Sequence, residues 1–225
     1  MPIITTRPAS PTPVQTQCQK PRGWFGRFEL WRMNRSHSKL TDWGLSHVSV
    51  APHFTVLDVG CGGGRTVSKL AALAAQGKVY GVDFSDASVA ASKRTNARHI
   101  AGGRVEIREG SVSQIPFADS TFDLVTAIET HFWWPNLASD IREVFRVIKP
   151  GGSVILIAEV YKGANTMASR VFEKHGAKLG ATLLSVDEHR ELLANAGFSD
   201  VQVIKGRAKA WICALGKKPL PPLVC

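Results

Sequence analysis

The sequence predicts an α/β fold with a doubly wound, mostly parallel sheet of seven strands and an antiparallel last strand. Short runs rich in β-branched residues alternate with segments of helical length along residues 54–216. A glycine-rich turn follows the first run, and turn residues separate the later elements. Repeated strand–helix units of this kind form parallel sheets that bind ligands at the carboxyl ends of their strands.

The first half of the sheet is predicted to contain three strands and two helices. The run FTVLDVG is typical of a buried strand, and Gly77 closes the helix that follows it. Ser85 or Asp86 caps the second helix, because a short polar side chain accepts a hydrogen bond from the first helical turn. In order, the elements are strand 54–60, helix 65–77, strand 78–85, helix 86–101 and strand 104–110.

The second half of the sheet is predicted to contain four strands and two helices. The sequence KPGG ends the first of these helices, and Ser185 and Glu188 have the spacing of a capping box at the start of the second. Gly206 joins the two closing strands. In order, the elements are strand 121–129, helix 136–148, strand 153–160, helix 185–198, strand 200–206 and strand 208–216.

The net charge of +10 is confined to the two ends of the chain. Residues 1–50 and residues 205–225 each contribute +5, whereas residues 51–204 hold sixteen residues of each sign. Nucleic-acid enzymes usually carry their positive charge along a groove of the folded domain. The neutral centre therefore argues against a nucleic-acid substrate.

The chain length fits one domain with an extension at each end. We expect residues 1–22 to form a disordered leader, residues 23–50 an amphipathic cap or lid, residues 51–215 the folded domain and residues 216–225 a tail. No run has the length of a signal peptide or of a membrane span. The four cysteines form no C-x-x-C pair, which indicates reduced thiols in a cytoplasmic protein without zinc.

The glycine-rich turn VLDVGCGGG carries the main functional signal. A strand, a glycine loop and a helix beginning at Arg65 place backbone N–H groups around an anionic or carboxylate-bearing ligand. The dinucleotide motif G-x-G-x-x-G fails, because Arg65 stands where its third glycine belongs, and the P-loop ending Gly-Lys-Ser/Thr is absent. The turn has the form D-x-G-x-G-x-G, and Asp83 follows at the end of the second strand, where a carboxylate accepts hydrogen bonds from ribose hydroxyls.

Four segments together resemble the class I S-adenosylmethionine-dependent methyltransferases, whose fold is Rossmann-like. They are VLDVGCGGG, VYGVDFS, EGSVSQIPFADSTFDLVTAIE and REVFRVIKPGGSVIL, and they occur in the order and spacing of that family. The resemblance covers residues 55–160, roughly half of the chain, and is strongest to the small-molecule group that methylates quinones and sterols. It implies S-adenosylmethionine as the cofactor and a small molecule as the methyl acceptor.

The resemblance also implies roles for individual residues in cofactor binding. The loop glycines would lie beside the methionine part of the cofactor, Asp58 would organise the loop or reach the amino group, and Asp83 would bind the ribose. The family's GDA triplet is GSV here, so adenine contact would rest on Ser111, Val112 and Phe84. Cys61 is more typical of a small space-filling residue than of a reactive thiol. The predicted cofactor-binding set is Asp58, Gly60, Cys61, Gly62, Gly64, Asp83, Phe84, Ser111, Val112 and Glu129.

The acceptor side is predicted from the segments that follow the fourth and fifth strands. A hydroxyl, thiol or ammonium acceptor needs a base, and Glu129 and His131 are the candidates. For Glu129 a contact with the cofactor or a loop backbone is an equal alternative. For His131 the alternative is a loop residue that is satisfied by hydrogen bonds. Either of the adjacent tryptophans can be core packing or can line the acceptor pocket. The predicted acceptor-binding set is His37, Trp43, Trp133, Trp134, Glu159 and Tyr161. No close spacing of ligands supports a metal site.

Three interpretations stand for the basic, aromatic segment 23–48: a lid over the site, contact with a membrane surface, or a cap on the sheet. A nucleic-acid or protein methyltransferase would carry an acceptor motif such as N-P-P-Y after the fourth strand, and ETHFWWPN lacks it. A binding module that retains the fold without turnover is the remaining alternative. The sequence leaves the oligomeric state and the methylated element open.

Overall fold

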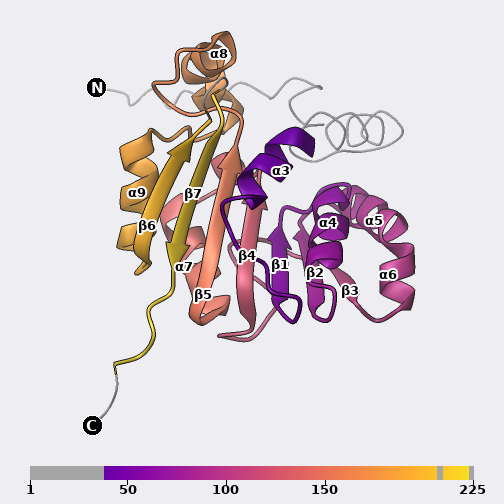
Figure 1. Ribbon diagram of the computed structural model, residues 1–225. Helices are drawn as coiled ribbons and strands as arrows, with labels where there is room; N and C mark the ends of the chain where they lie inside the picture. The colour runs from indigo at the N-terminus through magenta and orange to yellow at the C-terminus, as the bar shows by residue number, and fades with distance from the viewer. Residues whose placement is uncertain (1–37, 207–209, 223–225) are drawn as a thin grey trace, which may run out of the picture.

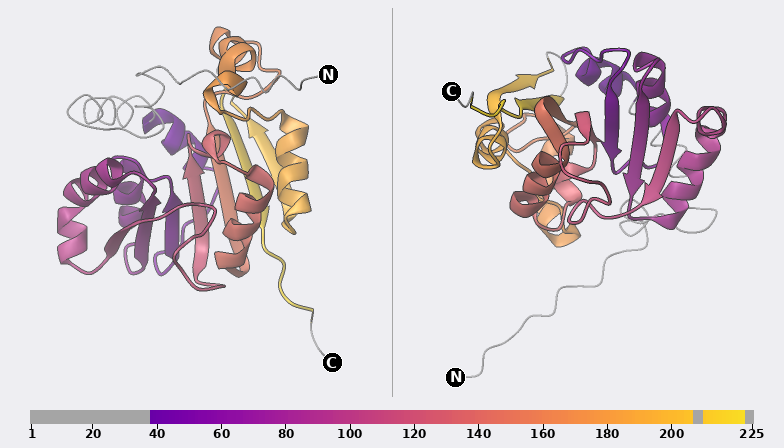
Figure 2. Two further views of the ribbon diagram at one scale, coloured as in Figure 1. Left: turned by 180° about the vertical axis from the view of Figure 1, so that it is seen from behind. Right: turned by 90° about the horizontal axis from the view of Figure 1, so that it is seen from below.

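The computed structural model describes residues 38–206 and 210–222, which form one twisted sheet covered by helices on both faces (Figures 1 and 2). The spatial order of the strands is β3-β2-β1-β4-β5-β7-β6. β7 pairs antiparallel with β5 and with β6, and the other pairs are parallel. The strands are β1 (Thr55–Val59), β2 (Lys78–Asp83), β3 (Val105–Glu109), β4 (Phe122–Ile128), β5 (Ile148–Ala158), β6 (Ser199–Lys205) and β7 (Ile212–Lys217). The predicted fold class is confirmed.

The helices divide between the two faces of the sheet according to their buried residues. Leu40, Val67 and Val89 join one apolar cluster with Val56 of β1, whereas Leu57 of β1 belongs to the cluster on the opposite face. One face carries α3 (Ser38–Leu45), α4 (Arg65–Leu73), α5 (Asp86–Thr95) and α6 (Ala97–Ala101), and the other carries α7 (Leu137–Val147) and α9 (Val186–Asn195). Because both faces of β1 and β4 are covered, these strands consist almost entirely of buried residues.

Several predicted boundaries are wrong, and three of them have a visible structural reason. The helix predicted over 65–77 ends at Leu73, because Ala74 leaves the helical conformation with φ −80° and ψ 59°. The helix predicted over 86–101 is interrupted at Asn96, whose side-chain amide donates to the carbonyl oxygens of Gly64 and Ser92 (both 2.9 Å). KPGG lies within a strand instead of between a helix and a strand, because β5 begins directly after α7.

One region had no sequence prediction. Between β5 and α9 the chain forms α8 (Met167–His175) and the short 3-10 helix η2 (Gly176–Leu179). Thr166 caps α8, since its hydroxyl accepts the N–H of Ser169 at 3.2 Å. Figure 1 shows α8 standing beyond the carboxyl ends of β4 and β5, at the edge of the sheet that also carries the glycine loop.

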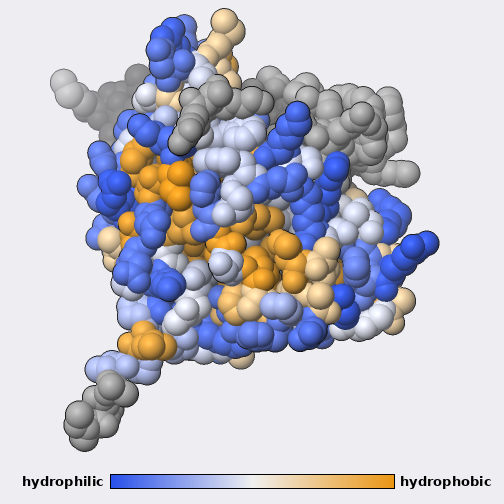
Figure 3. Space-filling model, viewed as in Figure 1, coloured by the Kyte–Doolittle hydropathy of each residue, from blue (hydrophilic) through white to orange (hydrophobic). Residues whose placement is uncertain are grey.

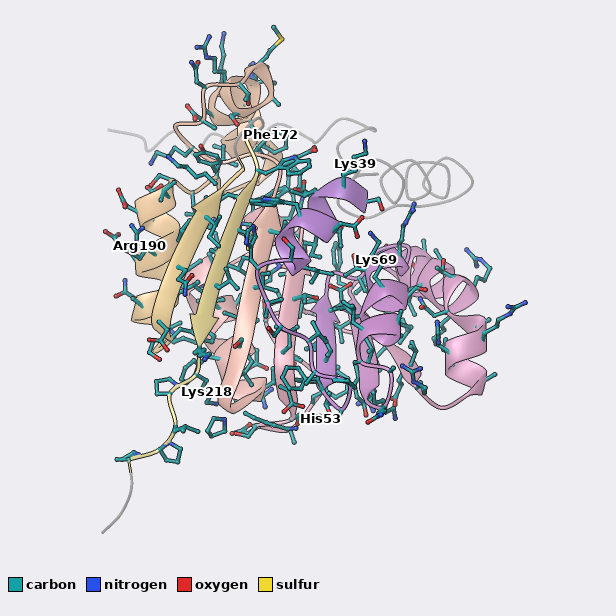
Figure 4. The ribbon with its side chains drawn as sticks, in the orientation of Figure 1. Lys39, His53, Lys69, Phe172, Arg190 and Lys218 are labelled. Carbon is teal, nitrogen blue, oxygen red and sulfur yellow. The ribbon has the colours of Figure 1, made fainter. Side chains whose placement is uncertain are left out.

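The described part of the N-terminal segment packs on the sheet. In α3, Leu40 and Leu45 are buried, and a Cβ on Gly44 would lie 2.2 Å from the side chain of Ile157 in β5. Lys69 reaches from α4 to α3, where it bonds the Ser38 hydroxyl at 3.0 Å and pairs with Asp42 (Figure 4). Residues 1–37, which include the expected leader, lie outside the described residues. Within the described ranges, no helix is long and apolar enough to cross a membrane.

Candidate functional site

Asp58 lies near the end of β1, which pairs with β2 and β4, and its side chain is buried. Its Oδ1 atom accepts a hydrogen bond of 2.6 Å from the hydroxyl of Thr126 on β4. Burial raises the pKa of this carboxyl from 3.8 to about 7; the bond from Thr126 opposes the rise, and the nearby charge of Asp83 adds to it. A neighbouring cation would stabilise the ionised form of Asp58.

The loop after β1 is folded tightly by its glycines. Gly60, Gly62 and Gly64 all have positive φ, between 50° and 79°. A Cβ on Gly60 would lie 2.3 Å from the Thr130 hydroxyl, and one on Gly64 would lie 2.4 Å from the Ser92 hydroxyl. Backbone conformation and protein neighbours therefore both exclude side chains from Gly60 and Gly64.

The loop turns toward β2 and ends at the start of α4. The amides of Gly60 and Cys61 both donate to the carbonyl oxygen of Val82, at 2.8 and 3.1 Å. Gly64 is the N-cap of α4 and supplies no side-chain hydrogen bond to the first turn. A helix N-terminus without a side-chain cap is suited to an anionic or carboxylate group of a ligand.

Asp83 closes the other side of this loop. Its carboxylate accepts the N–H of Gly62 and the N–H of Ser85, both at 2.9 Å, so it connects the loop to the start of α5. Burial raises the pKa of Asp83, and the two backbone donors oppose that rise. Each carboxylate oxygen can accept more than one hydrogen bond, so acceptor capacity remains for a ligand hydroxyl. Phe84, the next residue, is 48% exposed, which leaves ring surface for contact with a flat ligand.

The remaining residues predicted to bind cofactor differ in exposure. Ser111 is exposed and its hydroxyl accepts the N–H of Ser113 at 3.2 Å, whereas Val112 is buried in the core. Cys61 is buried, and burial next to two carboxyl groups raises the pKa of its thiol well above the ordinary value. A thiol with this pKa is a poor nucleophile, which supports a space-filling role.

Glu129 occupies a strained backbone position directly after β4. Its φ is 59°, which costs a non-glycine residue about 1–3 kcal/mol. Its N–H donates to the carbonyl oxygen of Ile157 at 2.8 Å, and its carboxylate accepts the N–H of Glu159. The structure thus brings Glu129 and Glu159 together across the ends of β4 and β5.

His131 forms a buried pair with His189 of α9. The Nε2 atoms of the two rings lie 3.1 Å apart, and Nδ1 of His189 lies 2.7 Å from the carbonyl oxygen of Ser185. A carbonyl can only accept, so Nδ1 of His189 carries a proton, its Nε2 accepts, and Nε2 of His131 donates. Burial lowers the pKa of both rings, and for His131 the proximity of His189 lowers it further. Both rings are therefore neutral near pH 7.

The predicted acceptor-binding residues lie in different clusters. Trp133 and Tyr161 join an apolar cluster that also contains Phe132 and Phe172, whereas Trp134 is buried in the main core with its indole N–H 3.3 Å from the Thr130 hydroxyl. Trp43, on α3, instead packs against Trp211 with ring centroids 5.6 Å apart. His37 lies outside the described residues.

Comparison with known proteins shows which family the chain resembles. Residues 57–156 match the model of a methyltransferase domain, and these residues span β1 to β5 with the whole of the loop described above. This part of the chain is thus similar to methyltransferase domains, and its fold is that of S-adenosylmethionine-dependent methyltransferases.

Individual relatives agree with this assignment. An O-methyltransferase, cnsE, of Penicillium expansum is 28% identical over 148 residues, which cover 66% of this chain and 53% of the relative. A demethylmenaquinone methyltransferase of Lactiplantibacillus plantarum is 32% identical over 114 residues, which cover 50% of this chain and 48% of the relative. The chain thus spans about half the length of these curated relatives.

A solved structure agrees with the assignment at the level of the fold. The crystal structure of a SAM-dependent methyltransferase from Aquifex aeolicus superposes with a TM-score of 0.69 at 19% identity and covers 84% of this chain and 96% of its own.

The methyltransferase domain has a cradle that fits its class cofactor. The glycine loop leaves no room for side chains at Gly60 and Gly64, and α4 presents an uncapped N-terminus beside it. Asp58 and Asp83 are buried carboxyls whose ionised forms a cationic ligand would stabilise. These features match a ligand that carries a carboxylate, an ammonium, a sulfonium and a ribose.

Sequence reasoning missed several residues that support the methyltransferase site. Thr126 holds Asp58, Asn96 holds the carbonyl of Gly64, and His189 holds His131. The sequence does give a signal for Thr126, because Thr126 and Asp123 are the two polar residues of an otherwise apolar strand. The other two contacts join residues 32 and 58 positions apart, and no local pattern indicates such pairs.

Proposed function

We propose that this protein transfers a methyl group from S-adenosylmethionine to a small-molecule acceptor. The observation that supports this most is the group formed by Asp58, the glycine loop and Asp83 at the carboxyl ends of β1 and β2. The group lies beside the point where strand order reverses between β1 and β4, which is where sheets of this type bind their ligands.

S-adenosylmethionine supplies a methyl group that is already activated by its sulfonium. The protein then has to bind the acceptor, align it with the methyl group and exclude water. Asp83 binds the ribose in this proposal, Phe84 and the backbone near Val112 contact the adenine, and Asp58 interacts with the amino group. The activity and cofactor are properties of the family, and the proposal extends them to this chain.

For an acceptor that must lose a proton, Glu129 is our preferred base. Its carboxylate lies at the carboxyl ends of β4 and β5 and accepts the N–H of Glu159. His131 also stays a candidate, but its ring is only 2% exposed and its Nε2 atom is committed to His189. We therefore favour a positioning role for His131.

The acceptor pocket is proposed on the side of Trp133 and Tyr161. These aromatic residues form one cluster under α8, close to the base candidates along the chain. Glu159 would contact a polar group of the acceptor, and His37, Trp43 and Trp134 complete the proposed set. The names of the relatives point to quinone-type or hydroxyl acceptors for those proteins, and a small acceptor with an aromatic ring would suit the cluster here.

The part of segment 23–48 that precedes α3 is proposed as a lid, because methyl transfer needs a site closed to water. Peripheral membrane contact by this segment is the alternative, and a cytoplasmic location is part of the same proposal. Since α3 belongs to the core, a truncation that tests the lid should end before Ser38. Removing residues 1–36 should abolish most turnover and leave cofactor affinity within about tenfold.

Calorimetry tests the proposal directly. The protein should bind S-adenosylmethionine and its demethylated product but neither NAD nor ATP tightly. Asp83→Ala should lower affinity roughly tenfold to a hundredfold, because it removes charged hydrogen bonds worth about 1.5–3 kcal/mol. Asp119→Ala, at an exposed carboxylate paired with Arg146, is the matched control and should leave affinity unchanged. Binding of NAD without binding of S-adenosylmethionine would refute the proposal.

Turnover requires a separate assay. Radiolabelled cofactor and a panel of quinones, phenols, amines and thiols should reveal methyl transfer to at least one small molecule. Transfer only to nucleic acid or protein would favour a nucleic-acid or protein methyltransferase. Tight cofactor binding without transfer to any acceptor would favour a binding module.

A further inference from the structure

The outward face of α8 combines exposed apolar and cationic side chains. Met167, Arg170, Val171 and Lys174 occupy positions i, i+3, i+4 and i+7, so they form one stripe along the helix. Met167 is 83% exposed and Val171 is 53% exposed, the two largest exposed fractions among large apolar side chains of the described helices. Figure 3 shows apolar and hydrophilic atoms side by side over α8.

The opposite face of α8 attaches the helix to the molecule. Ser169 is fully buried, and Phe172 lies with its ring centroid 5.9 Å from that of Phe132 and 6.0 Å from that of Trp133. Figure 4 shows Phe172 on the side of α8 that faces the strands. The stripe of Met167 and Val171 is therefore directed away from the protein.

The charges on α8 are separated by face. Its only acidic residue, Glu173, follows Ser169 by four positions, and its carboxylate accepts the N–H of Gly163 at 2.6 Å. In the described ranges no ion pair involves Arg170 or Lys174. The exposed stripe thus presents two apolar side chains and two cations without a neutralising acid.

We propose that this stripe docks the protein on the surface of an anionic lipid bilayer. Cations attract the negative headgroups, and Met167 and Val171 enter the boundary between headgroups and acyl chains. An acidic protein or a nucleic acid would match the cations, but two protruding apolar side chains between them fit a lipid interface better. Docking in this orientation places the aromatic cluster of Trp133 against the membrane side of the molecule.

Co-sedimentation of the full-length protein with vesicles tests this docking without any cofactor. Wild-type protein should bind phosphatidylcholine vesicles that contain about 30% phosphatidylglycerol and should bind pure phosphatidylcholine much more weakly. Arg170→Gln with Lys174→Gln should lower the partition coefficient about 25-fold, since each cation near an anionic surface contributes about fivefold. Met167→Ser with Val171→Ser should lower it at least tenfold.

Matched controls change the same chemistry elsewhere. Lys93→Gln with Arg94→Gln removes two exposed cations from the last turn of α5, and Leu73→Ser with Leu220→Ser removes two exposed apolar side chains. Both control pairs should change partitioning less than threefold. All variants alter exposed side chains, and thermal unfolding verifies that each is folded.

Three results would overturn the proposal. The first is absence of binding to anionic vesicles by the wild-type protein. The second is retention of binding by both α8 pairs, which would assign membrane contact to another segment such as 23–48. The third is loss of binding in the cation pair but not in the apolar pair, with equal binding to a soluble polyanion, which would show attraction to negative charge without insertion in lipid.

Discussion

Replacing Asp58 by asparagine should make the cofactor-free protein more stable above pH 7. Burial holds the pKa of the native Asp58 at about 7, compared with 3.8 for an ordinary aspartate. Between these values the unfolded chain releases a proton that the native protein retains, so the free energy of unfolding decreases as pH rises. Above pH 7 Asp58 is ionised in both the folded and the unfolded protein, and the full free-energy cost of burying its carboxylate is present.

The magnitude follows from the two pKa values. Each pKa unit is worth about 1.4 kcal/mol, so a rise from 3.8 to about 7 corresponds to a cost on the order of 4 kcal/mol at pH 8. An asparagine at this position would be neutral at every pH, and its side-chain oxygen could still accept the hydrogen bond from Thr126. We therefore expect Asp58→Asn to gain roughly 2–4 kcal/mol at pH 8 and almost nothing at pH 4.

Urea unfolding at several pH values between 4 and 8 measures this difference. Asp119→Asn, which changes an exposed carboxylate, is the control for general effects of charge. The reasoning would be refuted by a difference between Asp58→Asn and wild type that stays constant with pH, or by destabilisation at pH 8. The variant should also bind S-adenosylmethionine more weakly, because it lacks the carboxylate.

Three further predictions test other parts of the site. Gly64→Ala should destabilise the fold by at least about 2 kcal/mol, because φ is +79° and the new Cβ would meet Ser92. The control is Gly103→Ala, where φ is +71° but the space around the residue is open, and it should cost only about 1 kcal/mol in the same urea assay. His189→Leu should cost about 1–3 kcal/mol of stability, because it leaves the Nε2–H of His131 unpaired. The wild-type protein should lose stability as pH falls below about 6.5, because the histidines bind protons in the unfolded chain but stay neutral in the buried pair. If the free energy of unfolding of the double variant His131→Phe/His189→Phe differs from that of the wild type by the same amount at every pH, the predicted loss of stability at low pH is wrong. The affinity for S-adenosylmethionine should rise about tenfold from pH 6 to pH 8 as Asp58 ionises, and calorimetry of Asp58→Asn should show a flat profile.

The sheet and the glycine loop could be predicted from sequence because local patterns encode them. The apolar run that ends at Val59 must be covered on both faces, and positive φ at three alternate positions requires glycine. α8 could not be predicted in the same way, since its inner face contributes only Ser169 and Phe172 to the interior. Met167 and Val171 recur at helical spacing but lie on the exposed face, so the period does not indicate a helix that covers the core.

One boundary failed because a tertiary contact overrides local preference. Helical periodicity continues through Asn96, yet its side chain binds the backbone of Gly64 and the helix divides there. For the same reason the sequence placed His131 correctly after β4 but could not show the direction of its ring. That direction depends on His189, which reaches it from a helix more than fifty residues later.

Three acidic residues at the carboxyl ends of neighbouring strands share one property: each costs free energy in the protein alone. Asp58 and Asp83 are carboxyls whose pKa is raised by burial, and Glu129 has a left-handed backbone. Such costs persist where function requires them, because a scaffold of buried central strands can offset a few kcal/mol. In the proposed complex the ammonium of the cofactor would stabilise the ionised form of Asp58, and the ribose hydroxyls would donate hydrogen bonds to Asp83. A cofactor that carries both groups would offset the cost of two carboxyls that the packing of the sheet alone would not favour, whereas an anionic dinucleotide has a ribose but no ammonium.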